Sequence, residues 1–420
     1  MQGNQQNSAA CCSLPAAHFS APSWAEIDLD ALTHNFRTLQ SLLTPDSSTR
    51  GLTGDAHSSV PGRRSSLPVA RLIPVVKANA YGHGAIPVAQ ALSGAGATAF
   101  AVARVGEGFE LRQAGIRKEI LVLEGAWPGQ EEELLRHGLT ATVYSADGVR
   151  RLGRAAQEFH TPVRVHIKVD TGMNRLGVAW DGIEEFLRAM QETPALQAGG
   201  VFSHLACAEE EDSTFTLEQI RRFRHALERM NRAGIEPGET HFANSAGLLY
   251  CPQLRTYSAR PGIALYGYPP APDRCGVSLK PVLTMKTRVG HIHTVRAGES
   301  IGYNRRFIAA RETRAVTLPI GYADGCDRRL AGQGRVIIRG RWAPVLGAIS
   351  MDMIVADITD LPEVREGDEV ILLGSTAECR MDASVWATLL GTIPYEILSR
   401  ISPRVPRVYR GGDDRSVFPR

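Results

Sequence analysis

Strand-like and helix-like segments alternate from about residue 71 to residue 266, and this alternation constrains the fold more than any other feature. Short apolar runs that favour strands occur at 71–78, 98–103, 119–124, 140–144, 163–170, 199–206, 239–244 and 260–266. Stretches with helical spacing separate most of them, at 82–94, 105–114, 130–137, 147–159, 182–192 and 215–233, with a shorter connection at 246–250. Eight strands separated by helices favour a (β/α)8 TIM barrel of the α/β class. An open, doubly wound sheet is the alternative, although no G-x-G-x-x-G motif follows the first strand.

The pattern changes after about residue 280, where short alternating runs punctuated by Gly and Pro predict a second, mostly-β domain. These runs lie at 282–295, 314–320, 335–338, 344–349, 353–357 and 369–373, and one helix is expected near 382–391. We therefore predict a barrel domain at 23–281 and a C-terminal β domain at 282–410. Residues 24–29 are also strand-like and precede a helical stretch at 30–43 that Asp30 would cap. That strand could pair with the β domain, since the barrel already has its eight strands.

Three segments are dense in polar and small residues: 1–22, 45–69 and 411–420. Such a composition cannot bury enough apolar surface to offset the entropy lost on ordering. We therefore predict a disordered N-terminal extension, a flexible insertion and a C-terminal tail. A long surface loop adds little to the entropy of loop closure, so the insertion is compatible with the barrel.

Composition narrows the classes of function. With 43% apolar and 22% charged residues, the chain is expected to be globular. The net charge of +3 is small, and no dense Lys/Arg tract with interleaved aromatic residues argues for nucleic-acid binding. No stretch approaches the roughly 18 apolar residues that a membrane span needs, and residues 1–22 lack a secretory-signal pattern. The seven cysteines are scattered without a C-x-x-C pair, so we expect a cytoplasmic protein with reduced thiols and no metal site.

Residues 74–84, PVVKANAYGHG, place a lysine where an apolar run breaks into small, turn-forming residues. Strand alternation would put Val75, Lys77 and Asn79 on one face. Lys77 would then end the first strand, where barrels carry their active sites. A lysine in a partly dry pocket becomes a usable nucleophile that can condense with an aldehyde cofactor. A solvated edge residue is the commoner alternative for a lone lysine.

The fifth strand combines an apolar and a polar face. Its residues alternate between the set Val163, Val165, Ile167 and Val169 and the set Arg164, His166, Lys168 and Asp170. The apolar set should pack outward on the helices, so the polar set should face the barrel interior. Buried charges need partners, and a second cation, Arg175, follows Lys168 closely. The two cations would repel each other, and a purely structural charge cluster is the alternative interpretation.

Polar and small residues at the last strands predict a phosphate site. His204 ends the sixth strand, Ser245 ends the seventh, and Arg260, Gly262 and Ile263 open the eighth. Backbone amides near the last strands of a barrel commonly bind phosphate. The serine and the two residues after Pro261 therefore form a candidate cradle. A simple helix cap is the alternative for the serine, and a surface cation is the alternative for the arginine.

Several well-separated motifs resemble those of the alanine racemases, and they occur in that family's order. The motifs are PVVKANAYGHG at 74–84, DTGMNRLG at 170–177, RPGI at 260–263, SIGY at 300–303, LPIGYADG at 318–325 and GAISMDM at 347–353. The resemblance covers roughly residues 24–410. It implies a fold-type III pyridoxal-phosphate enzyme that forms a homodimer with active sites shared between the chains. Ser350 departs from the cysteine of many relatives and could adjust the substrate pocket.

The resemblance implies two catalytic bases. Lys77 would form the Schiff base with pyridoxal 5′-phosphate and act on one face of the substrate, and Tyr303 of the second subunit would act on the other. Tyr303 would remove the α-proton of L-alanine while Lys77 delivers a proton to the opposite face, and D-alanine would follow the reverse order. Met351 would touch the substrate, and Tyr322 would line its access route.

The other implied roles concern the cofactor and the substrate carboxylate. The phosphate would be held by Tyr81, Ser245, Gly262, Ile263 and Tyr395. Arg260 would face the pyridine nitrogen with His204 behind it, and a permanent cation there would favour proton return over transamination. The lysine that matches Lys168 is often carbamylated in this family. As an anion it would hold Arg175 against the cofactor's phenolic oxygen and the substrate carboxylate.

These features predict an amino-acid isomerase, an alanine racemase that supplies D-alanine for peptidoglycan synthesis. Three alternatives bind the same cofactor: a racemase of broader substrate range, a non-catalytic barrel protein and a decarboxylase of basic amino acids. The non-catalytic proteins resemble the barrel alone and lack a domain with Tyr303 and Met351. The decarboxylases differ in the lysine motif and place a partner cysteine at the site. Racemases of broader range usually carry a secretory signal.

Overall fold

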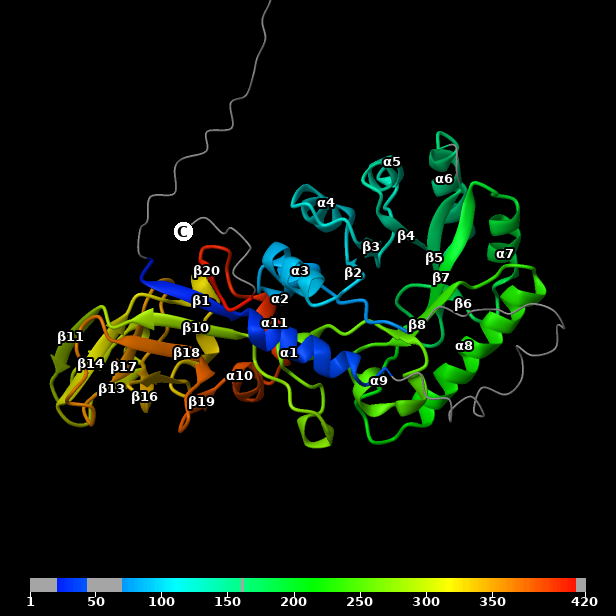
Figure 1. Cartoon of the computed structure of the whole chain (residues 1–420). Helices are drawn as coiled ribbons and strands as arrows, with labels where there is room; N and C mark the ends of the chain where they lie inside the picture. Colours follow the sequence, from blue (N-terminus) through cyan, green and yellow to red (C-terminus); the bar gives the residue numbers. More distant parts are fainter. Residues whose placement is uncertain (1–20, 44–69, 160–161, 413–420) are drawn as a thin grey trace, which may run out of the picture.

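The computed structural model of the chain describes residues 21–43, 70–159 and 162–412 (Figure 1). Residues 1–20 and 413–420, and the whole expected insertion at 45–69, lie outside the described residues. Figure 1 shows the parallel strands and their helices on the right and a second sheet on the left. The two parts meet at the centre of the molecule, where the functional site is built.

Parallel strands curl into a barrel whose last gap is closed by residues 71–76. In spatial order the strands are β2 (Ala99–Val102), β3 (Glu119–Val122), β4 (Thr140–Val143), β5 (Val163–Asp170), β7 (Leu196–Phe202), β8 (Glu239–Ala243) and β9 (Ser258–Ala259), and a short β6 (Val178–Ala179) pairs with β5. Leu72 bridges to Ala259 and Val75 bridges to Ala101, both in parallel, so the segment joins β9 to β2. The predicted α/β barrel is therefore confirmed.

The eighth strand was predicted at 260–266, and this was wrong, because the only strand described in this region lies just before that range. Strand β9 ends at Ala259, and most of the expected run at 260–266 forms instead the 3-10 helix η3 (Ile263–Tyr266). Pro261 accounts for the break, because proline has no N–H for the strand ladder and restricts the residue before it. As a result, the chain turns into the mouth of the barrel at these residues, whereas a strand would have continued past it.

Helices surround the barrel (Figure 1). They are α3 (Ala85–Gly94), α4 (Val105–Gln113), α5 (Glu131–Arg136), α6 (Ala146–Ala156), α7 (Glu184–Gln191), α8 (Thr214–Arg232) and α9 (Ser245–Tyr250). An earlier helix, α1 (Leu29–Gln40), begins one residue before the expected cap, so Asp30 as N-cap was wrong. The cap is Asp28, whose carboxylate accepts a hydrogen bond from the Ala31 N–H at 2.8 Å.

Within the described ranges, no helix is both long and apolar enough to cross a bilayer.

The C-terminal domain is a largely antiparallel sheet. In spatial order it contains β11 (His291–Val295), β14 (Thr313–Leu318), β17 (Ile354–Asp357), β16 (Arg341–Leu346), β15 (Arg335–Ile338), β18 (Glu369–Ser375), β10 (Leu283–Arg288), β1 (Ser23–Asp28) and β20 (Arg407–Arg410), with β19 (Arg380–Met381) beside β18. The N-terminal strand β1 thus lies in this sheet, antiparallel to β10 and parallel to β20. The expected helix near 382–391 is α10 (Ala383–Leu390), and the sequence pattern missed a second one, α11 (Pro394–Ser399).

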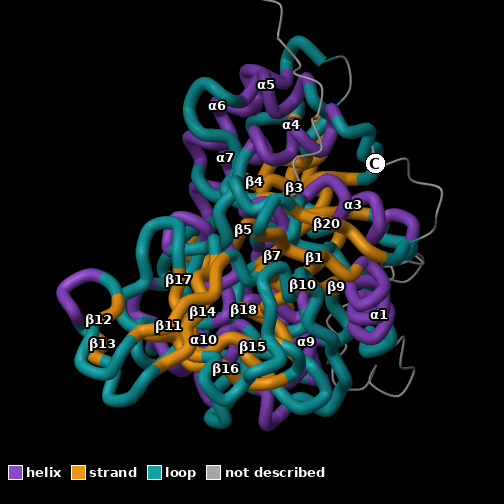
Figure 2. Tube along the Cα trace, turned by 90° about the vertical axis from the view of Figure 1, so that its left-hand side faces the viewer, coloured by secondary structure: helices purple, strands orange, loops and turns teal. Residues whose placement is uncertain are grey.

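A small two-stranded ribbon stands apart from the main sheet. Strands β12 (Ser300–Ile301) and β13 (Phe307–Ile308) pair only with each other, and the 3-10 helix η5 (Tyr303–Arg305) connects them. Figure 2 shows this ribbon projecting from the β domain, away from the barrel. The projection leaves the connecting turn open to solvent in the single chain.

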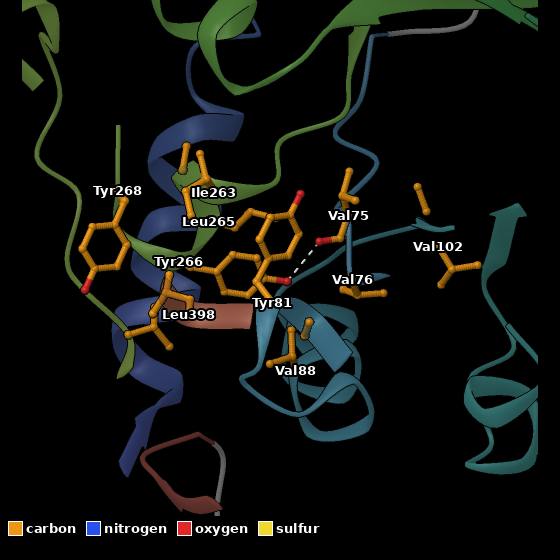
Figure 3. Packing of buried hydrophobic residues seen from close by; sticks show 14 of the residues in the cluster. Val75, Val76, Tyr81, Val88, Val102, Ile263, Leu265, Tyr266, Tyr268 and Leu398 are labelled. Carbon is orange, nitrogen blue, oxygen red and sulfur yellow. Dashed lines mark hydrogen bonds between the residues drawn. The ribbon is translucent and has the colours of Figure 1, made fainter. Parts of the chain in front are cut away.

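Apolar packing joins the barrel mouth to the β domain (Figure 3). The rings of Tyr81 and Tyr266 lie 4.9 Å apart, and the Tyr266 hydroxyl donates a hydrogen bond to the Val75 carbonyl at 3.0 Å. Leu398 of α11 packs beside them, and a Cβ on Gly82 would collide with its carbonyl oxygen. The second domain therefore fixes the backbone that follows Lys77.

Candidate active site

A cavity of about 680 Å3 opens at the end of the barrel where the strands finish. Its lining includes ten of the residues predicted from the sequence: Lys77, Tyr81, Lys168, Arg175, His204, Ser245, Arg260, Gly262, Ile263 and Tyr395. These residues come from most of the strand ends and from α11. The structure therefore brings together the expected lysine, the cationic side chains and the candidate phosphate cradle.

Lys77 begins a left-handed turn and does not end a strand. The short helix α2 (Lys77–Tyr81) contains four consecutive non-glycine residues, Ala78 to Tyr81, with φ between 52° and 54°. The predicted strand at 71–78 is therefore wrong beyond Val76, and Asn79 does not share a strand face with Lys77. A left-handed turn costs roughly 1–2 kcal/mol per L-residue, so tertiary contacts must hold it.

Glu107 of α4 is one of the contacts that hold this turn. One carboxylate oxygen accepts the Ala78 N–H at 2.6 Å. The other oxygen accepts the N–H groups of Ala103 and Arg104 at 2.8 and 3.1 Å. From the opposite side, the Arg407 guanidinium of β20 donates to the Gly82 carbonyl at 2.9 Å. A single carboxylate thus ties the residue after the lysine to the end of the neighbouring strand.

We expect Glu107→Ala to release this turn. The variant leaves backbone donors unpaired, which should lower the free energy of unfolding by about 1–3 kcal/mol. Hydrogen exchange followed by mass spectrometry should show faster exchange in a peptide spanning residues 77–85. Glu110→Ala, an exposed position on the same helix, is the control and should leave exchange unchanged. Unchanged hydrogen exchange in the Glu107 variant would show that other contacts are enough to hold the turn.

The cavity wall is cationic. Burial, together with the charge of Arg175, lowers the pKa of the Lys77 amine. Burial and the charges of Arg260 and Arg175 lower the pKa of Lys168 to about 8. Burial also lowers the pKa of His204 well below its ordinary value, which keeps this ring neutral near pH 7. A site with this charge distribution favours a ligand that carries several negative charges.

Arg260 is almost fully buried and held on both terminal nitrogens. Nη1 donates to His241 Nδ1 at 2.7 Å and to the carbonyl of the same residue at 2.8 Å. Nη2 donates to the Ser203 carbonyl at 2.6 Å and lies 3.4 Å from His204 Nδ1. The histidine expected behind Arg260 was His204, but His241 makes the closer contact. Burial lowers the pKa of Arg260 to about 9, so the group remains a cation at pH 7.

The candidate cradle is preorganised by Ser245. Its hydroxyl oxygen accepts the backbone N–H groups of Gly262 and Ala264 at 3.0 and 3.3 Å. A Cβ at position 262 would collide with the Tyr81 hydroxyl, so only glycine leaves room for that hydroxyl. Burial raises the pKa of Tyr81, which keeps its hydroxyl protonated as a donor, and the ring of Tyr395 lies 5.9 Å away. The hydroxyls of Ser245 and Tyr81 line the cavity and can donate hydrogen bonds, which suits a phosphate group.

Tyr303, Tyr322 and Met351 lie on the β domain and do not line this cavity. Tyr303 is 67% exposed, Met351 53% and Tyr322 43%. Their loops adjoin, because the Tyr322 N–H donates to the Ser350 carbonyl at 3.0 Å and a Cβ on Gly302 would lie 3.2 Å from the Ala348 nitrogen. One chain therefore presents two separate sets of predicted residues, one in the barrel and one on the exposed face of the β domain.

Comparison with known sequences decides the family. Residues 62–270 match the family described as alanine racemase, N-terminal domain, and residues 282–409 match alanine racemase, C-terminal domain. The chain belongs to the alanine racemase family. Alanine racemase of Syntrophobacter fumaroxidans is 42% identical over 382 residues, covering 91% of this chain and 96% of that protein. Alanine racemase of Symbiobacterium thermophilum is 41% identical over 391 residues, covering 93% and 97%.

Solved structures of alanine racemases share the fold. The enzyme from Bacillus anthracis with bound L-Ala-P matches with a TM-score of 0.83 at 32% identity, covering 96% of this chain and 98% of that one. The enzyme from Bartonella henselae with covalently bound pyridoxal phosphate matches with a TM-score of 0.79 at 30% identity, covering 93% and 100%. The similarity to alanine racemases thus extends through both domains.

Three side chains at this racemase-family site escaped the sequence analysis. They are Glu107, which anchors the turn, His241, which accepts from Arg260, and Phe202. The Phe202 ring lies 4.8 Å from the Arg260 guanidinium carbon and 5.5 Å from Lys168 Nζ, and it stacks on His241 at 4.6 Å. The π-face of this ring attracts both cations. A phenylalanine in an apolar strand gives no sequence signal for such a role.

Proposed function

We propose that this chain interconverts L-alanine and D-alanine with pyridoxal 5′-phosphate bound through Lys77. The observation that carries the proposal is that Lys77, Arg175, Arg260 and Ser245 line one cavity in a member of the alanine racemase family. The relatives of similar length are named alanine racemase, and one solved relative holds the same cofactor covalently. We further propose that the protein is cytoplasmic and supplies D-alanine for peptidoglycan synthesis.

The residues in the cavity fit this cofactor. The Ser245 hydroxyl, whose oxygen accepts two backbone amides and whose own hydrogen is left to donate, would bind a phosphate together with the hydroxyls of Tyr81 and Tyr395. Lys77 supplies an amine whose lowered pKa makes the neutral, nucleophilic form more available. When bound, pyridoxal phosphate supplies an electron-accepting ring that stabilises the charge left by removal of a substrate α-proton. Arg260, a buried cation, disfavours a second positive charge beside it.

Two side chains would move the α-proton. The Lys77 amine accepts or returns a proton on one face of the substrate, and the phenolic oxygen of Tyr303 does so on the other. Arg175 would hold the substrate carboxylate, Met351 would contact the substrate, and Tyr322 would line the route by which it enters.

The proposal requires a homodimer. Tyr303 lies outside the cavity of its own chain, on a ribbon that projects from the β domain (Figure 2). Large apolar side chains are exposed on and near it: Tyr303, Ile308, Tyr322, Met351 and Met353. Exposed apolar groups gathered in this way are typical of a protein interface. A second chain docked there would place its Tyr303 opposite Lys77 of the first.

We expect Lys168 to carry a carbamate. The lowered pKa of Lys168 makes its neutral amine available, and addition of CO2 would turn one of several clustered cations into an anion beside Arg175. The intact mass measured under non-denaturing, neutral conditions should exceed the sequence mass by one CO2, and acid should remove the difference. Lys168→Met should show no such difference. An unmodified wild-type mass would mean that Lys168 acts as an amine.

The substrate range tests the function. Purified protein loaded with pyridoxal phosphate is incubated with L-Ala, L-Ser, L-Lys or L-Arg, and both enantiomers are followed by chiral chromatography. The proposal predicts that L-Ala is racemised fastest and that L-Lys and L-Arg are not turned over. Comparable racemisation of all four would indicate a racemase of broad range. Release of CO2 from the basic amino acids, or no turnover at all, would overturn the proposal.

A further inference from the structure

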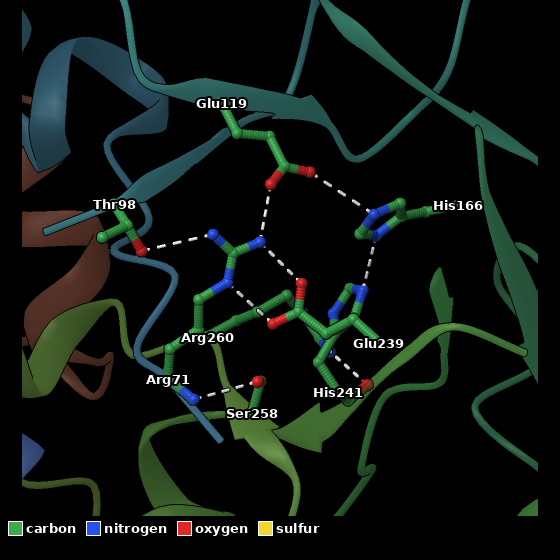
Figure 4. Close-up of polar contacts among 8 residues, drawn as sticks. All are labelled: Arg71, Thr98, Glu119, His166, Glu239, His241, Ser258 and Arg260. Atoms are coloured by element: carbon green, nitrogen blue, oxygen red, sulfur yellow. Dashed lines mark hydrogen bonds and ion pairs between the residues drawn. The ribbon is translucent and has the colours of Figure 1, made fainter. Parts of the chain in front are cut away.

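Two buried histidines connect Arg260 to the floor of the barrel (Figure 4). Arg260 Nη1 donates to His241 Nδ1 at 2.7 Å, and His241 Nε2 lies 2.8 Å from His166 Nδ1. His166 Nε2 in turn lies 3.4 Å from the Glu119 carboxylate. The contacts run from the segment just after β9 through β8 and β5 to the start of β3, from the cavity to the opposite end of the barrel.

The groups at the two ends of this row of contacts, Arg260 and Glu119, determine which ring nitrogen of each histidine carries the proton. A guanidinium can only donate, so His241 Nδ1 must accept and its proton must lie on Nε2. His241 Nε2–H then donates to His166 Nδ1, which must also be unprotonated. The remaining His166 proton lies on Nε2 and faces the carboxylate, which can only accept. Burial lowers the pKa of His241 well below its ordinary value, in keeping with a neutral ring.

The backbone is shaped to place both rings inside the barrel. The β5–β7 register shifts between Val165 and His166, and the β8–β9 register shifts between His241 and Ala243. Such irregularities re-aim a side chain relative to a regular strand. Gly200 on the neighbouring strand makes room, since a Cβ there would lie 2.7 Å from the His166 ring. His166 is 3% exposed and His241 is fully buried.

The carboxylate at the far end is itself held in place. Arg71 donates to Glu119 at 2.6 Å and to both oxygens of Glu239 at 2.6 and 2.9 Å, and it reaches Thr98 at 3.2 Å. The contacts of Glu119 with His166 and Arg71 lower its pKa to about 2 against the opposing effect of burial, so the group is ionised near pH 7. The Glu119 carboxylate therefore remains a hydrogen-bond acceptor for His166 near pH 7.

We propose that Glu119 and His166 are positioning residues that hold His241 in the tautomer that accepts from Arg260. Loss of the Glu119 acceptor lets the His166 proton move to Nδ1, where it opposes the His241 Nε2–H. That conflict is relieved only if His241 turns or changes tautomer, and either change removes the Nδ1 acceptor of Arg260. The effect on catalysis rests on the proposed function, whereas the tautomers do not.

The first test reads the tautomers directly. Nitrogen-15 NMR of histidine-labelled full-length protein, with and without pyridoxal phosphate, distinguishes protonated from unprotonated ring nitrogens. The proposal predicts unprotonated Nδ1 and protonated Nε2 for both His166 and His241. A protonated Nδ1 on either ring in the wild-type protein would overturn the proposal, whether or not the protein racemises alanine and whether or not any variant folds.

Variants separate positioning from simple ion pairing. Glu119→Leu should mix the tautomers of both histidines and lower kcat roughly tenfold or more with little change in KM, a barrier change of about 1.4 kcal/mol per tenfold. Glu119→Gln keeps an acceptor oxygen and should restore the wild-type nitrogen signals. Glu239→Leu removes the other partner of Arg71 and is the control, with stability lowered but tautomers unchanged. Equal tautomer shifts in the Glu119→Leu and Glu239→Leu variants, or none in Glu119→Leu, would contradict the proposal.

Discussion

Lys77→Ala is expected to abolish racemisation of both alanine enantiomers and to remove the visible absorbance of lysine-bound pyridoxal phosphate. The variant removes the only covalent anchor that we propose for the cofactor and one of the two bases at the same time. The loss should therefore exceed the factor of about 10²–10⁴ that a single general base typically contributes. Absorption spectra and chiral analysis of the same preparation measure both effects.

Lys118→Ala is the matched control for this variant. Lys118 is an exposed lysine before β3 and should be replaceable without effect on either measurement. The β-domain side chains are untouched by the Lys77 substitution, so the proposed dimer should be retained by this variant in size-exclusion chromatography. Racemisation that survives in Lys77→Ala would mean that another amine, with Lys168 as the obvious candidate, anchors the cofactor.

Tyr303→Phe should impair the two directions of proton removal unequally. The phenyl ring keeps the shape of the side chain but has no hydroxyl to ionise, so proton abstraction from L-alanine should fall by about 10²–10⁴. Exchange of the α-hydrogen of D-alanine with solvent, which Lys77 catalyses from the other face, should fall much less. Proton NMR in D2O follows each exchange separately.

The control for this second variant is Tyr257→Phe, a partly buried tyrosine whose ring packs 6.1 Å from that of Phe223 and which does not line the cavity. Equal loss of exchange for the two enantiomers in Tyr303→Phe would argue against the division of roles between lysine and tyrosine. The same outcome would leave the family assignment intact, because that rests on residues 62–270 and 282–409 as a whole.

Mixing the two inactive variants tests whether the sites are shared. In a mixed dimer of Lys77→Ala and Tyr303→Phe chains, one site would lack both bases and the other would have both intact. Activity should therefore reappear after the variants are unfolded and refolded together. Sites contained within one chain would each keep one defect, and no activity would return.

The barrel could be predicted from the sequence because each strand and helix leaves a local signal. Alternating apolar runs and helical stretches repeat along residues 71–266, and the change of pattern near residue 280 marks the second domain. The predicted strand at 260–266 is an exception, since Pro261 interrupts that strand-like run and the short strand β9 lies just before it. Motifs that carry the family resemblance predicted the cavity residues, which are mostly near strand ends.

The shape of the lysine turn could not be predicted, because it depends on distant contacts. Glu107 lies 29 positions from the amide that it binds, and Arg407 lies 325 positions from the carbonyl that it contacts. Without them, the run after Lys77 has no glycine until position 82 to favour positive φ. The sequence shows a lysine among small residues, and only the packed domains determine how its backbone turns.

The contact between the two buried histidines could not be predicted, for a related reason. His166 and His241 are 75 positions apart, and each looks like an isolated polar residue in an apolar strand. The alternation on β5 correctly placed His166 and Lys168 on the inner face of the barrel. It gave no indication that one would meet a second histidine and the other would line the cavity. Such pairings arise from the stagger between strands, which the sequence pattern does not specify.

We propose that Lys77, and not Lys168 of the same cavity, is the amine that binds the cofactor. Borohydride reduction of the protein loaded with pyridoxal phosphate, followed by peptide mass mapping, tests it most directly. We expect one pyridoxyl group per chain, on the peptide that contains Lys77. A label on Lys168 or on another lysine, or no label at all, would contradict it.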